Sequence, residues 1–359
     1  MFVALRDIRF ARGRFALMGA VVTLITTLVV FLYGLTGGLA SAASSTIAGL
    51  PADRIVFGAP AGAAPAVSFS SSSVSAEQQA GWAAAPGLAA VQPLGLSMTR
   101  LTATGTATSV SVLGAGTQLL PPLRSGSAPA EGQVAIGADT AAANHLVVGQ
   151  QVRIGPRTLT VSAITEQRSY AHAPTVWTTV ATWESLSGQS RPTALAVTAR
   201  SGTGPDFGAL DRAQNTKAVP VDAALSGIDG YAAEQGSLQL IQGFLFAVSA
   251  LVVGAFFTVW TVQRKPDIAV LKAVGASSGY LVRDALAQAA VVLLAGALLG
   301  GAAGAVGGAI ASAGVPFDLS PASVAVPVIA MVLLGLLGAV LAVRRITSVD
   351  PLAALGANR

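Results

Sequence analysis

Residues 285–317 read ALAQAAVVLLAGALLGGAAGAVGGAIASAGVPF, a stretch without Asp, Glu, Lys, Arg or His. An α-helix rises 1.5 Å per residue, so about 20 apolar residues cross the roughly 30 Å core of a bilayer. Three more charge-free stretches of this kind occupy residues 15–52, 235–263 and 319–343. We therefore expect an α-helical membrane protein with four transmembrane helices, one followed by three.

Composition supports a membrane protein with one large polar insert. Of 359 residues, 53% are hydrophobic and only 10% are charged, whereas soluble domains carry about 25% charged residues. Two other charge-free stretches, 55–76 and 101–123, contain prolines and runs of Ser or Thr and are excluded as spans. The first holds the serine cluster Ser68, Ser70 to Ser73 and Ser75. We expect residues 41–236 to form an α/β domain between helices 1 and 2.

Basic residues predict the orientation in the membrane. Eleven of the 21 Lys and Arg residues flank the spans: Arg6, Arg9, Arg12, Arg14, Arg264, Lys265, Lys272, Arg283, Arg344, Arg345 and Arg359. Because positive residues favour the cytoplasmic side, both termini and the 263–284 loop are expected there. The α/β domain is then extracytoplasmic, in a multi-pass protein of the cell (plasma) membrane. The basic residues follow the topology and form no separate patch, so no nucleic acid partner is expected.

The resulting division of the chain has nine segments. The apolar run of 15–40 is too long for the core of a signal peptide, so we expect a retained anchor. The segments are 1–14 (cytoplasmic N-terminal segment), 15–40 (transmembrane helix 1), 41–236 (extracytoplasmic α/β domain), 237–262 (transmembrane helix 2), 263–284 (cytoplasmic coupling loop), 285–312 (transmembrane helix 3), 313–321 (short outer loop), 322–343 (transmembrane helix 4) and 344–359 (cytoplasmic tail).

Within the insert, hydrophobic periodicity predicts several elements. Residues 133–136 and 194–199 are typical of strands, and residues 138–144 of a short helix. Apolar residues alternate in 152–154 and 158–164 on either side of a Gly-Pro pair, which predicts a hairpin with one buried face.

Helix 3 carries a stripe of glycines at every fourth position, Gly296, Gly300, Gly304 and Gly308. Small residues at this spacing let helices approach closely in lipid. The stripe predicts packing within the chain, against helix 2 or helix 4, or alternatively a subunit interface or a sliding surface.

The segment between helices 2 and 3 reads Arg264-Lys-Pro-Asp-Ile-Ala-Val-Leu-Lys-Ala-Val-Gly-Ala276. Pro266 and Asp267 suit the start of a helix, and Gly275 suits the position just past its end. Ile268, Val270 and Leu271 give this short helix an apolar side. A helix of this length is not stable alone, so it needs a partner surface.

This segment resembles the signature of the FtsX/MacB-like ABC transporter permeases, Arg-x-x-Glu-Ile-Gly-x-x-Arg/Lys-Ala-x-Gly-Ala. The chain matches it at Arg264, Asp267, Ile268, Ala269, Lys272, Ala273, Gly275 and Ala276, with Asp for Glu and Ala for Gly. Asp350-Pro351-Leu-Ala-Ala354-Leu355 is similar to the family's closing Pro-x-x-Ala-Leu, although Gly356 stands where a basic residue is common. The order of one helix, a large domain and three helices is also that of the family.

The resemblance implies a homodimer of this chain that works with two copies of a separate ATPase subunit. The coupling helix, with Arg264, Asp267, Ile268, Leu271, Lys272 and Gly275, would contact that ATPase. The chain has no Gly-x-x-x-x-Gly-Lys-Ser/Thr phosphate loop, so we expect a non-catalytic permease. Substrate would be extruded from the outer leaflet.

The layout is similar to that of the HrtB-type haem-exporting permeases and their DevC-type relatives. The segments Leu5 to Met18, Tyr33 to Gly38 and Tyr170 to Trp177 add to this resemblance. It implies haem, or a similar amphiphile, as the transported ligand, with no intrinsic cofactor, no resident metal and no catalytic residues.

Without cysteine, haem iron would be bound by Tyr, His or Met. Tyr170 and His172 lie two residues apart, so an extended segment would place them on one side. Tyr231 precedes helix 2, and Tyr33 lies inside helix 1. Each has a simpler interpretation: Tyr231 as an interfacial anchor, His172 as a surface residue and Tyr33 as a packing residue.

A competing function is mechanotransmission, in which an FtsX-like permease controls an extracytoplasmic partner protein without transport. A regulator of this kind should expose an apolar patch for its partner. A membrane-anchored hydrolase is disfavoured, because neither histidine lies in a recognisable catalytic motif.

Overall fold

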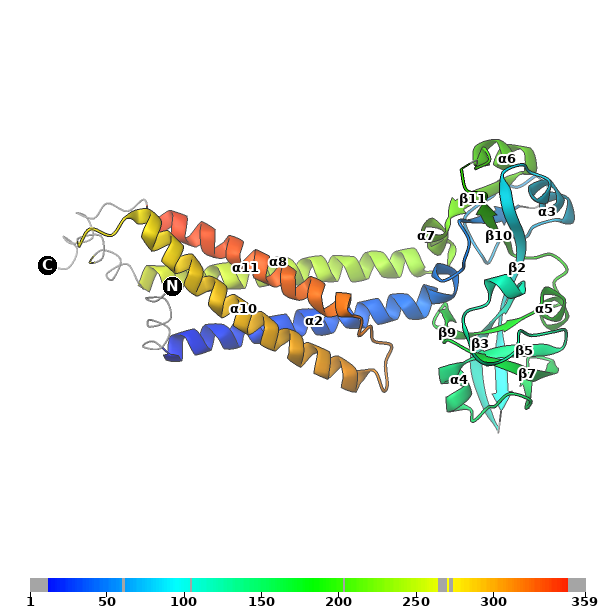
Figure 1. Ribbon diagram of the computed structural model, residues 1–359, viewed down its shortest axis with the longest axis horizontal. Helices are drawn as coiled ribbons and strands as arrows, with labels where there is room; N and C mark the ends of the chain where they lie inside the picture. The colour runs from blue at the N-terminus through cyan, green and yellow to red at the C-terminus, as the bar shows by residue number, and fades with distance from the viewer. Residues whose placement is uncertain are drawn as a thin grey trace. The chain divides into compact units, whose positions relative to one another are not determined.

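The computed structural model describes residues 12–59, 62–103, 105–202, 204–263, 270 and 274–347. These residues form two compact units (Figure 1). Residues 39–236 are called the α/β unit below, and the described residues of 12–38 and 237–347 are called the helical unit.

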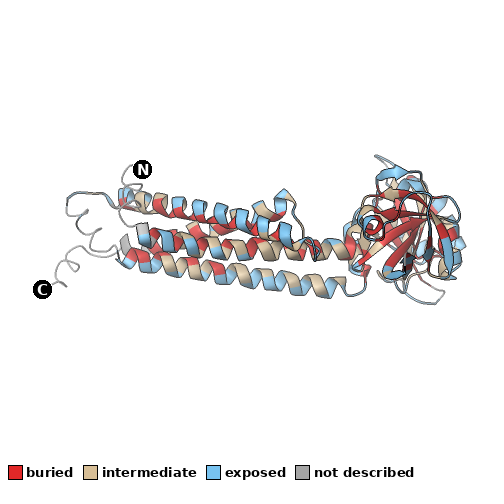
Figure 2. Ribbon diagram, turned by 90° about the horizontal axis from the view of Figure 1, so that it is seen from below, coloured by how far each residue is buried: buried red, intermediate tan, exposed pale blue. Residues whose placement is uncertain are grey.

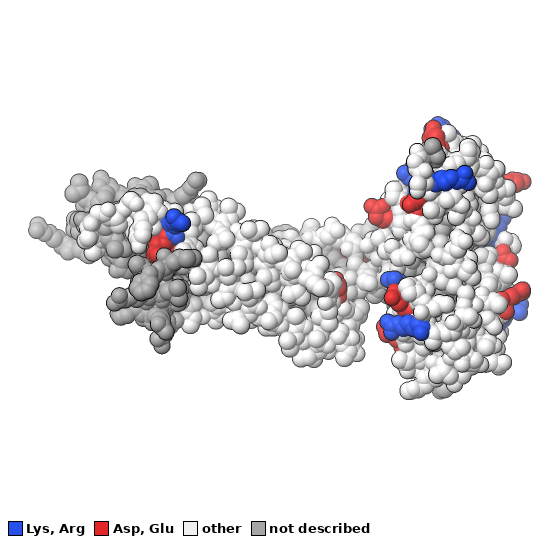
Figure 3. All heavy atoms as spheres, in the orientation of Figure 1, with Lys and Arg blue, Asp and Glu red and all other residues white. Residues whose placement is uncertain are grey.

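Four long apolar helices are the main feature of the chain outside the sheet. They are α2 (Arg12–Ala48), α8 (Tyr231–Gln263), α10 (Ser278–Ala311) and α11 (Pro321–Thr347). Each is long and apolar enough to cross a membrane, which confirms the predicted order of one helix before the α/β unit and three after it. Figure 3 shows that charged side chains on the visible face gather on the α/β unit and leave most of the helical surface uncharged.

Two helices continue past the expected spans. The span of helix 1 was expected to end at residue 40, but α2 continues to Ala48. Helix 2 was expected from residue 237 after a polar connector, but α8 begins at Tyr231. The last turns of α2 and the first turn of α8 therefore belong to the α/β unit.

The core of the helical unit takes side chains from all four helices. Phe15, Phe257, Leu293 and Met331 are among its buried members. The ring of Phe15 meets that of Trp260 edge-on, with centroids 6.0 Å apart. Exposed apolar side chains cover the opposite sides of the same helices, so the helices show alternating buried and exposed positions (Figure 2).

The glycine stripe of α10 faces α2. A Cβ atom added at Gly300 would lie 2.6 Å from the carbonyl oxygen of Thr23, and one added at Gly296 or Gly304 would lie within 3.0 Å of Val22 or Val30. Gly308 instead faces the ring of Phe317, in the loop before α11. The prediction that the stripe packs against helix 2 or helix 4 was therefore wrong. The four-residue spacing predicts a contact face but carries no information on which helix meets it.

The α/β unit is built on one 11-stranded sheet with the order β11-β1-β10-β2-β3-β9-β5-β7-β4. In addition, β6 pairs with β2 and β7, and β8 pairs with β9. The strands are β1 (Arg54–Gly58), β2 (Leu88–Ala103), β3 (Thr106–Gly114), β4 (Leu123–Gly126), β5 (Gln133–Gly137), β6 (Gln151–Ile154), β7 (Arg157–Thr165), β8 (Ser169–Tyr170), β9 (Ala173–Thr178), β10 (Ala194–Ala199) and β11 (Thr216–Pro220).

The long strand β2 joins the two halves of this sheet. Its first part, Leu88 to Leu94, pairs with β10, and its second part, Gly95 to Ala103, pairs with β3. One half therefore contains β11, β1 and β10, and the other contains the remaining strands (Figure 1).

Short helices cover one face of each half. They are α3 (Ala76–Ala83), α4 (Ala138–Ala143), α5 (Val180–Ser187) and α6 (Phe207–Gln214), whereas α7 (Val221–Ala224) and the 3₁₀ turns at Thr117–Leu119 and Leu225–Gly227 contribute to the core on the opposite face. Trp82 of α3 and Trp183 of α5 are fully buried in the two resulting cores. The predicted elements at 133–136, 138–144, 152–164 and 194–199 correspond to β5, α4, the β6–β7 hairpin and β10, so these predictions are confirmed.

The opposite face of the sheet carries a third core shared by both halves. Successive side chains of a strand point to opposite faces, and in β1 Val56 joins the core under the helices while Phe57 joins this third core. Ile47 of α2 is fully buried in it, together with Tyr170 and Ile228. The end of α2 is thus part of the hydrophobic core of the α/β unit.

Candidate functional site

The connection between β8 and β9 is a two-residue turn with an unusual sequence. Tyr170 pairs with Ala173, so Ala171 and His172 form the turn. Their φ angles are 48° and 62°. Hairpin turns with two positive φ angles normally use Asn-Gly or Gly-Gly, because side chains with a Cβ disfavour this region. Such a conformation persists only where surrounding contacts hold it.

Contacts with α2 hold this turn in place. The N–H of Ala171 donates to the carbonyl oxygen of Ala43 at 2.8 Å, and the N–H of His172 donates to that of Ala42 at 3.1 Å. A carbonyl has two lone pairs, so both oxygens can accept these bonds in addition to those of the helix. Two backbone hydrogen bonds to α2 therefore offset the strain of the turn.

Hydroxyl groups add a second connection between α2 and the sheet. The Thr46 hydroxyl lies 2.6 Å from that of Thr175 in β9, which lies 2.6 Å from the hydroxyl of Ser111 in β3. The N–H of Ser169 also donates to Ser45 Oγ at 2.9 Å. Because Thr46, Thr175 and Ser111 are buried, breaking this chain would leave unsatisfied polar groups.

The same turn also reaches α8. The His172 Nε2 atom lies 3.0 Å from Glu234 Oε2, in the first turn of α8. Tyr231 begins this helix, and its N–H donates to the carbonyl oxygen of Ile228 at 3.1 Å. The turn at Ala171 and His172 thus contacts the end of α2 and the start of α8, both within the α/β unit. We call Ala42, Ala43, Ala171, His172 and Glu234 the turn junction.

Tyr170 and His172 do not share one side, contrary to the expectation from an extended segment. The positive φ angles of the turn separate them, so Tyr170 is buried whereas the His172 side chain is 43% exposed. The Tyr170 ring meets Phe69 edge-on, with centroids 5.8 Å apart. Burial, followed by the nearby charge of Asp229, raises the pKa of the Tyr170 phenol above its usual range.

The other two tyrosine candidates lie in different surroundings. Tyr231 is half-buried and packs against the same core as Tyr170. Tyr33 is half-buried in α2, inside the helical unit, and its carbonyl oxygen accepts a hydrogen bond from Thr36 Oγ1 at 3.0 Å. The structure thus brings Tyr170, His172 and Tyr231 into the α/β unit, while Tyr33 belongs to the helical unit. Among the residues that the structure describes, no group of three or more His, Asp or Glu could hold a metal ion.

Most of the predicted coupling helix lies outside the described residues, namely Arg264, Asp267, Ile268, Leu271 and Lys272. Gly275 is described and has a φ angle of 101°. Just before it, the N–H of Val274 donates to the carbonyl oxygen of Val270 at 3.1 Å, as in a helical turn. Ser277 then caps α10, since its Oγ accepts from the N–H of Tyr280. Gly275 therefore occupies a bend in which a residue with a Cβ is disfavoured.

A loop before α11 contacts α2 in the helical unit, a feature that the sequence did not predict. The N–H of Asp318 donates to the carbonyl oxygen of Gly34 at 2.8 Å. The Asp318 carboxylate accepts hydrogen bonds from the N–H and the hydroxyl of Ser320, which precedes α11. Asp318 thus orders the start of α11 and ties it to α2.

Comparison with known proteins identifies the family. The family model for the MacB-like periplasmic core domain matches residues 15–207, and that for the FtsX-like permease C-terminal region matches residues 240–351. The first match covers more than half of the chain. The chain belongs to the FtsX/MacB-like family of ABC transporter permeases. This permease is therefore expected to work with an ATPase subunit, as ABC permeases do.

Relatives of this permease match it along its whole length. It is 27% identical over 359 residues to the "Putative hemin transport system permease protein HrtB" of Staphylococcus haemolyticus, and 99% of each chain is covered. It is 28% identical over 385 residues to an uncharacterised ABC transporter permease of Mycobacterium tuberculosis, again with 99% of each chain covered. The crystal structure of the periplasmic region of MacB from Actinobacillus actinomycetemcomitans matches 51% of this chain and 95% of that one, with 13% identity and a TM-score of 0.39.

Proposed function

We propose that this permease extrudes haem, or a similar amphiphile, from the outer leaflet of the cell membrane. The full-length similarity to a permease named for hemin transport carries this proposal. Under this proposal, the permease forms a homodimer and is itself non-catalytic. Two copies of a separate ATPase hydrolyse ATP and act on the coupling segment around Gly275. Both termini are cytoplasmic, and the α/β unit is extracytoplasmic.

The turn junction supports an ATP-driven movement of the α/β unit. It connects the end of α2 and the start of α8 to one hairpin through the Ala171, His172 and Glu234 contacts. The buried Thr46–Thr175–Ser111 hydroxyls attach α2 to two further strands. A displacement of either helix end would therefore be passed to the sheet instead of being absorbed by a loose linker.

Among the candidate haem ligands, Tyr231 is favoured over Tyr170. A tyrosine binds ferric haem through its phenolate oxygen. The raised pKa keeps Tyr170 protonated, which opposes this role. Tyr231 is half-buried at the start of α8, and the partly exposed His172 lies against the same helix through Glu234.

A haemin titration of the purified permease, with and without its ATPase, tests this proposal. We expect a saturable shift of the Soret band that weakens in Tyr231→Phe and His172→Asn. Asn tolerates the positive φ of position 172 better than most residues, so the turn should survive. Tyr280→Phe serves as the matched control, because Tyr280 is exposed in the first turn of α10. Absence of any saturable shift would contradict haem as the ligand.

Mechanotransmission is the second candidate, favoured by the same firm attachment of α2 to the sheet. The two functions differ in what ATP does. In proteoliposomes that contain the permease and its ATPase, an exporter should lower the haem content of the membrane when ATP is added. A mechanotransmitter should hydrolyse ATP without changing the haem content.

A further inference from the structure

The α/β unit contains a cleft that none of the functions above uses. Its volume is about 620 Å³, within the range of about 300–1,000 Å³ that small-molecule sites occupy. Five separate segments line it: residues 69–73, 96–98 and 170–171, residues 188–191 together with Thr193, and Asp229. The serine cluster singled out in the sequence thus forms one wall of a cavity.

The hydrogen bonds around the cleft hold its walls in place. Ser70 Oγ donates to Asp229 Oδ1 at 2.9 Å. Ser72 Oγ donates to the carbonyl oxygen of Thr193 at 2.6 Å and accepts from the N–H of Gly58 at 3.0 Å. Ser97 Oγ accepts from Trp183 Nε1 at 3.1 Å. These bonds connect both halves of the sheet to the cleft, which is therefore preformed.

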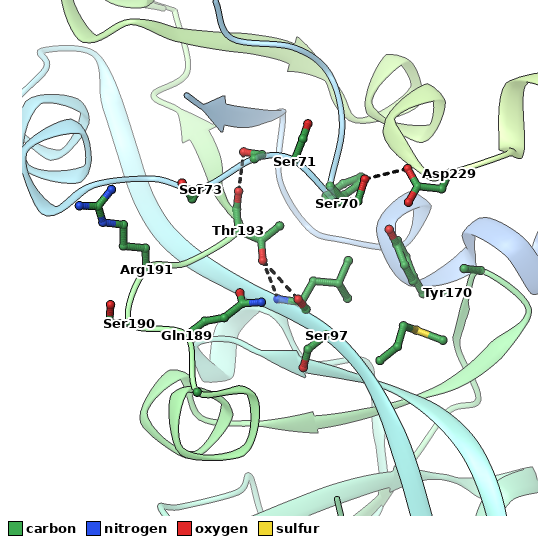
Figure 4. A pocket seen from close by; sticks show the side chains of 16 residues that line it. Ser70, Ser71, Ser73, Ser97, Tyr170, Gln189, Ser190, Arg191, Thr193 and Asp229 are labelled. Atoms are coloured by element: carbon green, nitrogen blue, oxygen red, sulfur yellow. Dashed lines mark hydrogen bonds between the residues drawn. The ribbon is translucent and has the colours of Figure 1, made fainter. Parts of the chain in front are cut away.

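Planar polar groups stand on two sides of the cavity. Figure 4 shows Gln189 on one side and Asp229 with Tyr170 on the other, while the Arg191 guanidinium at the edge points away from them. An amide and a carboxylate each present two polar atoms in one plane. Each of these groups can therefore bind two neighbouring hydroxyl groups of a ligand at once, one with each of its two polar atoms. Serine hydroxyls supply further groups that can either donate or accept.

Apolar surface lies beside these polar groups. Phe69, Leu96, Met98 and Tyr170 also line the cleft, and the Met98 side chain is exposed. A sugar ring has C–H faces that pack against such surface while its hydroxyls point to the polar walls. Tyr170 stays protonated and is therefore available as a neutral hydroxyl donor.

The charges of the cleft favour an uncharged ligand. Arg191 and Asp229 are its only charged side chains among the described lining residues, and they offset each other. A phosphorylated or dicarboxylate ligand such as haem would need an excess of positive charge. We propose that this cleft binds a short neutral saccharide.

The saccharide site also lies beside the turn junction. Ala171 belongs to both, and Asp229 precedes the first residue of α8 by two positions. A bound saccharide would therefore contact the hairpin that is bonded to the end of α2 and the segment that leads into α8. The site is placed to influence, or respond to, the position of these helix ends.

The test uses the full permease in phospholipid nanodiscs, because detergents with maltoside head groups would compete. Maltotriose and the β-1,4-linked disaccharide of N-acetylglucosamine are titrated by calorimetry and by saturation-transfer NMR. We expect saturable binding of at least one of them at one site per chain. Gln189→Ala and Asp229→Ala should each weaken it about tenfold, the effect of losing one or two hydrogen bonds of about 1 kcal/mol each.

Asp222→Ala is the matched control, since Asp222 is an exposed carboxylate of α7 outside the cleft. It should leave saccharide affinity unchanged. Failure of both saccharides to bind would overturn the proposal, as would binding that the Gln189 and Asp229 variants do not affect. A neutral tripeptide, titrated in parallel, should not bind, and binding of the peptide alone would overturn the proposal in favour of a peptide site. Haemin binding is measured separately, so the outcome for the export proposal is independent.

Discussion

The hydroxyl of Thr46, in α2, lies 2.6 Å from the hydroxyl of Thr175, in β9, and both side chains are buried. Thr46 lies 31 positions past residue 15, where the first span was expected to begin, yet it is bonded inside the sheet unit. A helix predicted to cross a membrane therefore ends as a structural part of the α/β unit. This attachment leads to the first prediction.

Thr46→Val should destabilise the permease while preserving the volume of the side chain. It removes one hydroxyl from a buried chain and leaves Thr175 with Ser111 as its remaining partner. We expect a loss of about 1–2 kcal/mol, measured as a lower midpoint of thermal unfolding. Thr102→Val, at an exposed position of β2, should change the midpoint little. Equal midpoints for the two variants would contradict a structural role for the hydroxyl chain.

Gly275→Ala should weaken the coupling between the permease and its ATPase. The φ angle of 101° disfavours any residue with a Cβ, although nothing lies within 4 Å of the added atom. Gly279→Ala is a close control, because that position is equally open but has no positive φ. The permease-stimulated rate of ATP hydrolysis should fall several-fold in the first variant and stay near normal in the second. Similar rates in both would contradict the role given to this bend.

Gly300→Ala should loosen the contact between α2 and α10. The added Cβ would lie 2.6 Å from the Thr23 carbonyl oxygen and 2.7 Å from Thr26 Cβ, so the helices must move apart. Overpacking of this kind costs about 1–3 kcal/mol. At Gly307, on the same helix, the nearest atom would lie 3.6 Å away, an ordinary contact. Thermal unfolding in detergent should show a lower midpoint for Gly300→Ala than for Gly307→Ala, and the reverse order would be inconsistent with the observed packing.

Tyr170 should ionise at a higher pH in the folded permease than a free tyrosine does. Burial, and then Asp229, raise the pKa of its phenol. Above a pH of about 10, the unfolded chain loses this proton while the folded chain keeps it. The contribution of neutral Tyr170 to stability is therefore complete below that pH and falls as the pH rises further.

Absorbance at 295 nm during an alkaline titration measures this ionisation. Tyr170→Phe should remove a component that titrates above the usual range of tyrosine. Tyr280→Phe should retain that component. If the high-pH component persists in Tyr170→Phe, the environment of Tyr170 differs from the buried one described above.

The spans and several strands could be predicted because each depends on a local pattern. Stretches without charge indicate the helices, and the alternation around residues 152–164 indicates the β6–β7 hairpin. The turn at Ala171 and His172 could not be predicted, because Ala-His is not one of the residue pairs typical of two-residue turns with two positive φ angles. Its conformation depends on hydrogen bonds to Ala42 and Ala43, more than 120 positions earlier.

The saccharide cleft could not be predicted from the sequence for a different reason. Its lining residues come from five segments between residues 69 and 229, and no one segment has the pattern of a binding site. The serine cluster was visible in the sequence, but it served there only to exclude residues 55–76 as a membrane span. Only the sheet topology brings Gln189, Arg191 and Asp229 to the same cavity.

The position of β1 in the sheet has a consequence for biosynthesis. This strand, Arg54–Gly58, follows α2 closely, yet its two neighbours are β10, Ala194–Ala199, and β11, Thr216–Pro220. It therefore stays unpaired while the ribosome adds more than 130 further residues. During that interval Val56 and Phe57 have no sheet to bury them, and an unpaired apolar strand is prone to aggregation. The nascent chain therefore passes through an aggregation-prone stage that ends only when β10 and β11 have been made, before the last three helices.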